Sequence, residues 1–338
     1  MKKPAKDFDI LDFVQSNIAS IGVILLIICG ISMYGRTFLN YKRNIINVFH
    51  YCSLLGIMGV GVNLSHIIGG RDLSVGAVAA CASMFCALGA PYGFVPALLF
   101  GLSVGVVFGL INGIVIAKFQ VQPFIATLGT QLAARGIALL INDEYSIAIS
   151  QTATALKFMG NGRLFGVIPM PTAIFISLVI IFSIVMKYTS LGRAIYAVGG
   201  NAEAAEMMGI RTTKIKIITY ILSGTMAALA GCTLCGHINA GQPTACQGWE
   251  MTIMAAVIIG GTPVKGGKGR ITGILYGVLF VQLITNVINL NGHINANWKD
   301  IITGLVLLAA VLLYAFADMR KEKKKNVRKI ETAAEAAK

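Results

Sequence analysis

The chain has 338 residues, of which 56% are apolar and only 12% are charged, and its mean hydropathy is +0.76. An average soluble domain carries roughly 25% charged residues, so this composition argues against a soluble globular protein and more strongly against a disordered one. The 38 glycines show no Gly-X-Y period, which excludes collagen. A helix-rich membrane protein remains.

Apolar stretches of about 20 residues predict membrane-spanning helices, because backbone polar groups in hydrocarbon must be paired within their own element. The eighth stretch is short and ends at Gly260 and Gly261, as expected of a broken or re-entrant helix. The period-2 alternation of a membrane β-barrel is missing. We therefore expect an all-α polytopic bundle of about ten transmembrane helices, at 18–35, 45–68, 74–90, 95–117, 123–141, 169–187, 217–236, 249–263, 270–289 and 298–317.

The basic residues orient these spans. With both termini placed in the cytoplasm, 21 of the 28 Lys and Arg residues fall on the cytoplasmic side, which is the positive-inside asymmetry. The formal net charge of +14 is therefore explained by topology, and no nucleic-acid partner is expected. The predicted organisation is an N-terminal tail at 1–17, a permease domain at 18–317 that contains a cytoplasmic loop at 188–216, and a basic C-terminal tail at 318–338.

Catalytic and metal-binding motifs are missing from the chain. There is no H-E-x-x-H, no G-x-S-x-G and no carboxylate pair in the middle of a span, so a zinc protease, a serine hydrolase and a proton-coupled carrier lack support. Cys232-x-x-Cys235 has metal or redox spacing, but a zinc site needs two more ligands and only His237 is near. We interpret both thiols as small apolar side chains and expect no metal site.

An ATP-binding motif is also missing. Residues 260–269 approach a Walker A sequence, but Thr262 occupies the first Gly position and Gly269 the Ser/Thr position. The segment also lies between two predicted spans, whereas a P-loop lies between a strand and a helix. If the chain takes part in energised transport, the motor is another polypeptide.

The cytoplasmic loop at 188–216 contains a predicted short helix. Asn201 can cap its start, Glu203 lies in its first turn where the helix dipole favours an anion, and Gly209 is a suitable stop. The intervening Ala, Glu and Met residues are strong helix formers. Two interpretations are equally supported: the helix docks into a groove of a cytoplasmic partner, or it caps the bundle at the lipid interface.

Five segments of the chain resemble the permease subunits of ribose/galactose/xylose-type ABC importers. Residues 192–209 resemble the coupling loop of that family, and Gly-Gly-Arg-Asp-Leu-Ser-Val-Gly at 69–76 resembles its G-G-I-D-L-S-V-G. The other three matches, in the order found in the family, are Gly-Leu-Ile-Asn-Gly at 109–113 paired with Pro-Phe-Ile-Ala-Thr-Leu-Gly-Thr at 123–130, Trp-Glu at 249–250 with 255–262, and the glycines at 266–273. Arg71 departs from the pattern, since the family has an apolar residue there.

The resemblance implies a multi-pass permease of the bacterial cytoplasmic (inner) membrane. Its implied partners are a cytoplasmic ABC ATPase, an extracytoplasmic sugar-binding protein, and a second permease copy or a paralogue that completes a dimer. This chain would bind no cofactor, because ATP and Mg²⁺ are used by the partner ATPase. Coupling to that ATPase is assigned to Gly192, Arg193, Gly200, Asn201, Glu203, Ala204, Ala205 and Gly209.

Two glycine-rich turns on the cytoplasmic side are predicted to be structural. In the first, Asp72 or Ser74 is expected to cap the third span. The sequence Ile-Ile-Gly-Gly recurs at 67–70 and 258–261, which suggests internal repetition. The residues assigned to these turns are Gly70, Asp72, Ser74, Gly76, Gly260, Gly261, Gly266 and Gly267.

A substrate pathway is predicted from polar and aromatic residues within the spans. Amides pair with the hydroxyls of a sugar, and an aromatic ring covers its C–H face. The alternative interpretation for each residue is hydrogen bonding between helices. The candidates are Asn112, Phe124, Thr127, Gln131, Asn286 and Asn289.

These observations predict a transporter subunit, with no catalytic residue of its own, that translocates a monosaccharide or related sugar. A permease of the same architecture for a nucleoside or another polar metabolite is a second hypothesis. A self-contained channel or ion-coupled carrier is a third. The sequence leaves open which sugar is carried and whether the dimer has identical halves.

Overall fold

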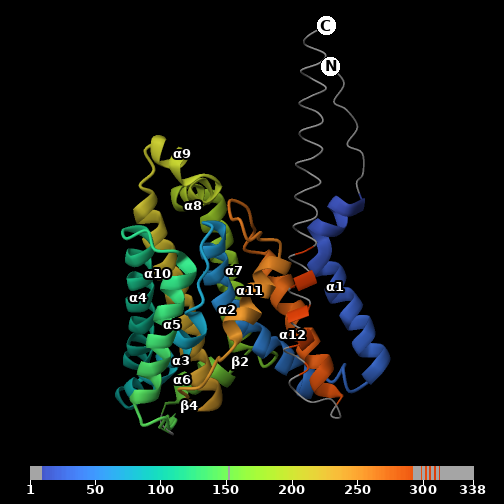
Figure 1. Ribbon diagram of the computed structural model, residues 1–338. Helices are drawn as coiled ribbons and strands as arrows, with labels where there is room; N and C mark the ends of the chain where they lie inside the picture. Colours follow the sequence, from blue (N-terminus) through green and yellow to red (C-terminus); the bar gives the residue numbers. More distant parts are fainter. Residues whose placement is uncertain are drawn as a thin grey trace.

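A computed structural model of the chain describes residues 10–150 and 153–291, with single positions between 298 and 312. This part of the protein is almost entirely helical, with two short antiparallel strand pairs (Figure 1). The elements are α1 Ile10–Tyr34, η1 Tyr41–Ile45, α2 Ile46–Ile67, α3 Val75–Gly89, η2 Ala90–Tyr92, α4 Phe94–Ala117, α5 Pro123–Leu140, β1 Ile147–Ala148, α6 Thr154–Asn161, β2 Arg163–Leu164, β3 Ile168–Pro169, α7 Met170–Tyr188, α8 Ser190–Gly200, α9 Ala202–Met207, α10 Thr212–Ile238, β4 Ala240–Gly241, α11 Trp249–Ile259 and α12 Gly273–Leu290.

Seven of the described helical segments are long and apolar enough to cross a membrane: η1 with α2, α3 with η2, α4, α5, α7, α10 and α12. Two shorter apolar segments, Ser20–Tyr34 and Trp249–Ile259, coincide with the predicted first and eighth spans. The eighth is short, as predicted, and ends before Gly260 and Gly261. The predicted tenth span at 298–317, the C-terminal tail and residues 1–9 of the N-terminal tail lie outside the fully described residues.

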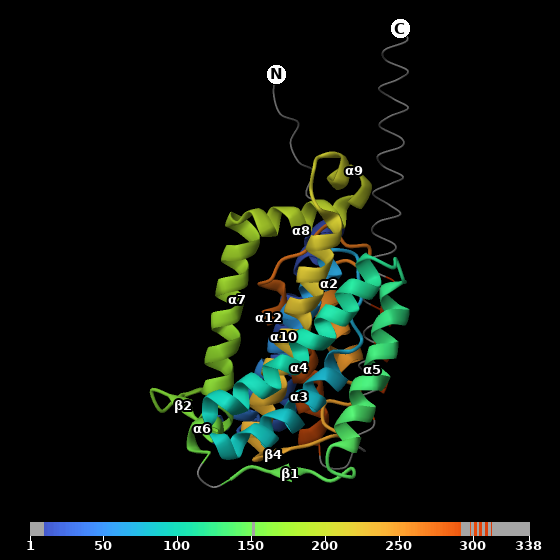
Figure 2. The ribbon, with the colours of Figure 1, turned by 90° about the vertical axis from the view of Figure 1, so that its left-hand side faces the viewer.

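The structure adds elements that hydropathy did not predict. The amphipathic helix α8 precedes the predicted loop helix, and α10 begins at Thr212, whereas the predicted span begins at 217. Lys214 and Lys216 lower the hydropathy of that first turn, but a helix can extend past the apolar layer because its backbone bonds are internal. Helix α6 and the strand pairs β1–β4 and β2–β3 form a layer at the end of the bundle opposite α8 (Figure 2).

Helices α2, α3 and α10 form the centre of the bundle. The apolar side chains along α2 between Cys52 and Ile67 are buried, as are most residues of α3. Helix α10 packs against α4, α3 and α2, whereas α4, α5 and α7 leave long apolar faces exposed. Helix α12 joins α2 and α11 on the other side and carries α1 on its outer face (Figure 1). A side chain exposed on such a face meets lipid rather than water.

Glycines allow α4 and α10 to approach each other closely. A Cβ added at Gly105 would collide with the carbonyl oxygen of Gly224, and a Cβ at Gly224 would collide with that of Gly105. Such small-residue contacts let membrane helices gain van der Waals packing where apolar lipid provides no hydrophobic driving force between helices. The α4–α10 pair is therefore held by backbone proximity.

We predict that Gly105→Ala or Gly224→Ala lowers stability by about 1–3 kcal/mol, since the added methyl group overpacks a tight contact. The thermal midpoint of unfolding of the purified protein in detergent measures the effect. Gly129→Ala on α5 is the matched control, because nothing lies within 4 Å of a Cβ added there. An unchanged midpoint in both test variants would contradict the close α4–α10 contact.

Candidate functional site

Helix α8 lies across one end of the bundle, between the ends of α7 and α10 (Figure 2). Its N-cap is Thr189, whose side chain accepts a hydrogen bond from the Gly192 backbone N–H at 3.3 Å. One face of α8, which includes Ile195 and Val198, is buried against the bundle. The Tyr196 hydroxyl donates to the Gly269 carbonyl at 2.8 Å; burial raises the pKa of Tyr196, which keeps this donor protonated.

Helix α9 confirms the predicted short loop helix. Asn201 is its N-cap and accepts a hydrogen bond from the Ala204 N–H at 3.0 Å. Glu203 lies in the first turn, and Gly209 follows the helix with φ +82°, where only glycine is unstrained. The side chain of Ala205 is fully buried, so this residue anchors α9 on the bundle.

Two large apolar side chains are exposed at the C-terminal end of α9, beside the exposed acids Glu203 and Glu206. Met207 is 90% exposed and Met208 is 71% exposed. Methionine is flexible and polarisable, and it is common on surfaces that accept a partner. Among the other residues assigned to coupling, Arg193, Gly200 and Ala204 are exposed and Gly192 is buried at the α7–α8 corner. Their role in coupling stays a prediction.

The two glycine-rich turns, which are far apart in the sequence, lie against each other beneath α8. The Gly267 N–H donates to the Ile67 carbonyl at 2.8 Å. A Cβ at Gly266 would press on the backbone of Gly69, and a Cβ at Gly199 would collide with the Ile67 carbonyl. The end of α2, the α11–α12 turn and helix α8 therefore meet as three backbones with no side chains between them.

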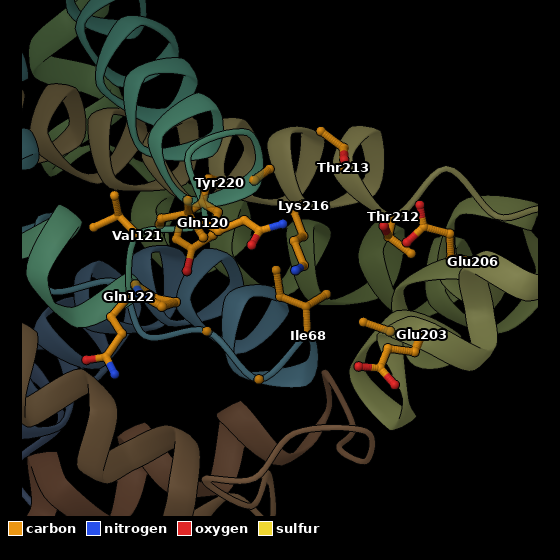
Figure 3. Close-up of a pocket in the computed structure, with 16 residues that line it drawn as sticks. Ile68, Gln120, Val121, Gln122, Glu203, Glu206, Thr212, Thr213, Lys216 and Tyr220 are labelled. Atoms are coloured by element: carbon orange, nitrogen blue, oxygen red, sulfur yellow. The ribbon is translucent and has the colours of Figure 1, made fainter.

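A cavity of about 460 Å³ opens at this end of the molecule; we call it the α9 cavity. It lies between α9, the first turns of α10, the α4–α5 loop and residues 68–70 (Figure 3). Glu203 and Glu206 of α9 line one side and Lys216 of α10 lies across from them. Other polar side chains in the lining are Gln120, Gln122, Thr212, Thr213 and Tyr220.

The last three residues of the chain between α2 and α3 are non-helical and buried within the bundle. Asp72, Leu73 and Ser74 are each at most 2% exposed. Side chains supply the hydrogen bonds that a helix would have made: the Leu73 N–H donates to Thr127 Oγ1 at 3.2 Å, and the Ser74 N–H donates to Asp72 Oδ1 at 3.0 Å. Irregular backbone is tolerated at membrane depth where protein shields it in this way.

A continuous hydrogen-bonded chain of side chains, which we call the Asp72 network, surrounds this segment. Asp72 accepts from the Ser74 hydroxyl at 2.6 Å through Oδ1 and from Ser223 of α10 at 2.7 Å through Oδ2. Asn112 of α4 donates to Ser74 Oγ at 3.1 Å and accepts from Thr130 of α5 at 2.7 Å. One hydrogen-bond network that ends at a buried carboxylate therefore connects four segments of the bundle: the α2–α3 connection, α4, α5 and α10.

Of the two residues expected to cap the third span, only Asp72 bonds to the start of α3, where its Oδ1 accepts the backbone N–H of Ser74 at 3.0 Å. Ser74 stands at the N-cap position of α3 but makes no side-chain capping bond there. The Asp72 carboxylate turns back onto Ser74 and across to Ser223. Burial explains why Asp72 also reaches Ser223: a carboxyl group in the bundle interior needs polar partners, and α10 provides one that the local sequence does not contain.

The six predicted pathway residues do not form one cluster. Asn112 and Thr127 are fully buried at the α2–α3 segment. The Asn286 amide pairs with Asn44, donating at 2.6 Å and accepting at 3.2 Å. Phe124 is 46% exposed on the outer face of α5, and Asn289 is exposed near the end of α12. Their contact with substrate stays a prediction.

Gln131 reaches a second buried acid. Its amide donates to Glu250 Oε1 at 3.0 Å, and the other carboxylate oxygen, Oε2, is buried without a partner. Arg135, one turn along α5, donates to the carbonyls of Pro243 at 2.6 Å and Ala245 at 2.9 Å. The start of α11 is thus attached to α5 by polar contacts, and one acceptor there remains free.

Sequence reasoning missed Tyr220 and Ser223 on α10. Both are fully buried, and Tyr220 Oη would collide with a Cβ at Gly70. A glycine at position 70 was the available signal, because glycine in such a turn indicates a close neighbour, but the sequence does not say which. For metals, no three His, Cys, Asp or Glu side chains in the described ranges are grouped to hold an ion.

Comparison with known proteins places these features in context. Residues 44–311 match the protein family described as branched-chain amino acid transport system / permease component. The ribose import permease protein of Bacillus subtilis is 37% identical over 295 residues, covering 87% of this chain and 90% of the relative. The fructose import permease protein of Bifidobacterium longum is 34% identical, covering 93% and 94%. The L-arabinose transport system permease protein of Escherichia coli is 33% identical, covering 90% of each chain. No solved structure matches significantly.

We predict that Ser223→Ala destabilises the protein by about 1–3 kcal/mol, because it leaves Asp72 Oδ2 buried without its donor. Thermal unfolding in detergent measures the loss. Ser103→Ala is the control, since the exposed Ser103 hydroxyl bonds only to a carbonyl of its own helix at 2.7 Å. If the two variants unfold at the same temperature, the Asp72 network does not stabilise the bundle.

Proposed function

Because the chain belongs to the family of branched-chain amino acid transport system permease components, we propose that it is the membrane-spanning subunit of an ATP-driven, binding-protein-dependent sugar importer. It is a multi-pass membrane protein, as its apolar helices require, and its bacterial relatives are transport permeases. The cytoplasmic membrane of a bacterium is its location. Its role is that of a transporter subunit rather than an enzyme.

The substrate class follows from the relatives. Three of them are named for ribose, fructose and L-arabinose, and each resembles this chain over about nine-tenths of its length. All three sugars are neutral and rich in hydroxyl groups. A monosaccharide is therefore the proposed cargo, although the family description mentions branched-chain amino acids.

The observation that carries the coupling proposal is the exposed apolar face of α9. Met207 and Met208 protrude from a short, capped helix that Ala205 anchors on the bundle. A cytoplasmic ABC ATPase with a complementary groove would bury these side chains by the helix-in-groove mode. The chain lacks a P-loop, so the energy must enter through such a contact.

The packing around α8 explains how a push on α9 would reach the membrane interior. Helix α8 lies between α9 and the glycine-rich turns, where Gly199 contacts Ile67 and the Tyr196 hydroxyl bonds to the Gly269 carbonyl. Because no flexible side chains separate these backbones, a displacement of α9 moves the ends of α2 and α12 with it. Rigid-body rocking of packed helices is a known form of such a transition.

An extracytoplasmic sugar-binding protein and a second permease copy or paralogue complete the proposed machine. The opposite end of the bundle, formed by α6 and the strand pairs (Figure 2), is the surface on which a binding protein would release sugar. The exposed face of α5, with Phe124 and Leu128, is available to lipid or to the second copy.

An ion-coupled carrier is the competing function, because buried acids such as Asp72 and Glu250 often mark proton pathways. Reconstitution of the chain with the ATPase and binding protein encoded beside it separates the two. We expect uptake of labelled sugar into vesicles to require ATP and to persist when ionophores collapse the ion gradients. Uptake by the chain alone that stops with the gradient would establish the carrier.

Helix α9 provides a second test. Met207→Glu with Met208→Glu is expected to weaken ATPase association at least about tenfold, since two exposed apolar side chains lose the burial that each contributes, about 1.5–3 kcal/mol. Co-purification with the ATPase measures the change. Tyr145→Glu is the control, because Tyr145 is 74% exposed near the opposite end. Equal ATPase recovery from both variants would remove α9 from the interface.

A further inference from the structure

We propose that the α9 cavity binds a monosaccharide, as a second sugar site at the end of the bundle where α9 lies. The inference rests on the proposed function, that the chain moves a sugar. It adds a specific binding site for the sugar, and it makes the position of α9 depend on whether sugar is bound there. The argument depends on one unpartnered hydroxyl, on the distribution of charge and on the composition of the wall.

Tyr220 provides the first observation. Its side chain is fully buried on α10, it lines the α9 cavity, and its hydroxyl has no hydrogen-bond partner in the described structure. Leaving a buried hydroxyl unpaired costs about 1–3 kcal/mol, so a polar ligand atom at this position recovers that free energy. Gly70 packs directly against this hydroxyl, since a Cβ there would collide with it, so no side chain of residue 70 fills the space beside it.

The charges around the α9 cavity select a neutral ligand. Glu203 and Glu206 lie on α9 and Lys216 lies on α10 (Figure 3). The two acids disfavour a phosphate or carboxylate ligand, and the lysine weakens the attraction of the acids for a cation. Hydroxyl groups suit both walls, because each can donate to a carboxylate and accept from an ammonium group.

The remaining wall favours a sugar over a zwitterionic amino acid. Uncharged donors and acceptors are provided by Gln120, Gln122, Thr212, Thr213 and the Tyr220 hydroxyl. An amino acid has only two polar groups to use against these side chains, whereas a monosaccharide has one hydroxyl on almost every carbon. The volume of about 460 Å³ falls in the range of about 300–1,000 Å³ that is usual for small-molecule sites.

Occupancy of the α9 cavity is linked to the position of α9. Ala202, Glu203 and Glu206 form part of its wall, and the remainder belongs to α10, the α4–α5 loop and residues 68–70. A ligand that bridges α9 to these elements binds one position of α9 more tightly than another, and it shifts the equilibrium toward that position. Sugar bound on this side therefore changes how readily α9 is displaced.

Direct binding of sugar tests the site. The full chain in lipid nanodiscs is titrated with D-ribose, L-arabinose and D-fructose, and saturation-transfer NMR reports the bound sugar. We expect at least one sugar to bind, and Tyr220→Phe and Lys216→Met each to weaken its binding about fivefold or more, the effect of losing one buried hydrogen bond. Lys214→Met is the matched control, because Lys214 lies on the same turn of α10, is exposed, and is not in the lining.

Three outcomes overturn the inference: no sugar binds to the wild-type chain, binding is equal in all variants, or L-leucine binds in place of every sugar with the same dependence on Lys216. Size-exclusion chromatography identifies a variant that fails to fold, and if Tyr220→Phe does so, Lys216→Met decides alone. ATP-dependent uptake by the wild-type complex is measured in parallel. Uptake without binding in the cavity overturns only this inference, whereas absence of uptake for all three sugars overturns the proposed function.

Discussion

The need to pair backbone polar groups inside an apolar bundle controls the architecture of this protein. The helical hydrogen bonds of α2 stop at Ile67 and those of α3 begin at Val75, and residues 72–74 of the chain between them are buried. In such an apolar interior the side chains of α5 and α10 provide polar partners for this segment. Thr127 Oγ1 accepts a hydrogen bond from the Leu73 N–H, and the Ser223 and Ser74 hydroxyls both donate to the Asp72 carboxylate. The helices around the break are therefore positioned by polar contacts as well as by packing.

The same break gives the molecule a direct connection from its surface to its interior. Residues 68–70, at the start of the extended chain, form part of the α9 cavity, and Ile67 contacts Gly199 of α8 and Gly267 of the α11–α12 turn. Glycines at these positions exclude side chains, so the three backbones cannot slide independently. In the proposed mechanism, a force applied at α9 would be passed to the non-helical segment between α2 and α3. This combination of a stiff exterior connection and a non-helical interior segment suits a protein that changes conformation as packed units.

The success of sequence reasoning differed between the helices and the polar residues. Seven of the ten predicted spans correspond to described helices that are long and apolar enough to cross a membrane, and the first and eighth correspond to shorter apolar helices, because a membrane-spanning helix must be apolar over its whole length. The short α9 was also predictable, since Asn201 and Gly209 act within one turn of the residues they terminate. The partners of Asn112, Asn286 and Gln131 were not: Asn44 is separated from Asn286 by 242 positions and Glu250 from Gln131 by 119. Nothing local to an amide indicates whether it will meet another helix or a substrate.

By itself the sequence determined that this is a helical membrane protein without its own ATPase motif, where most of its spans lie, and which residues begin and end the loop helix. These properties depend on composition and on interactions between residues that are close along the chain. Only the tertiary structure decided that Asp72 is bonded to Ser223, that the glycine-rich turn at 67–70 lies against residues 265–267, and that Tyr220, Lys216 and the acids of α9 line one cavity. Those contacts join segments far apart in the chain, and their geometry is set by how closely glycine-bearing helices can approach, which is a property of the packed bundle as a whole.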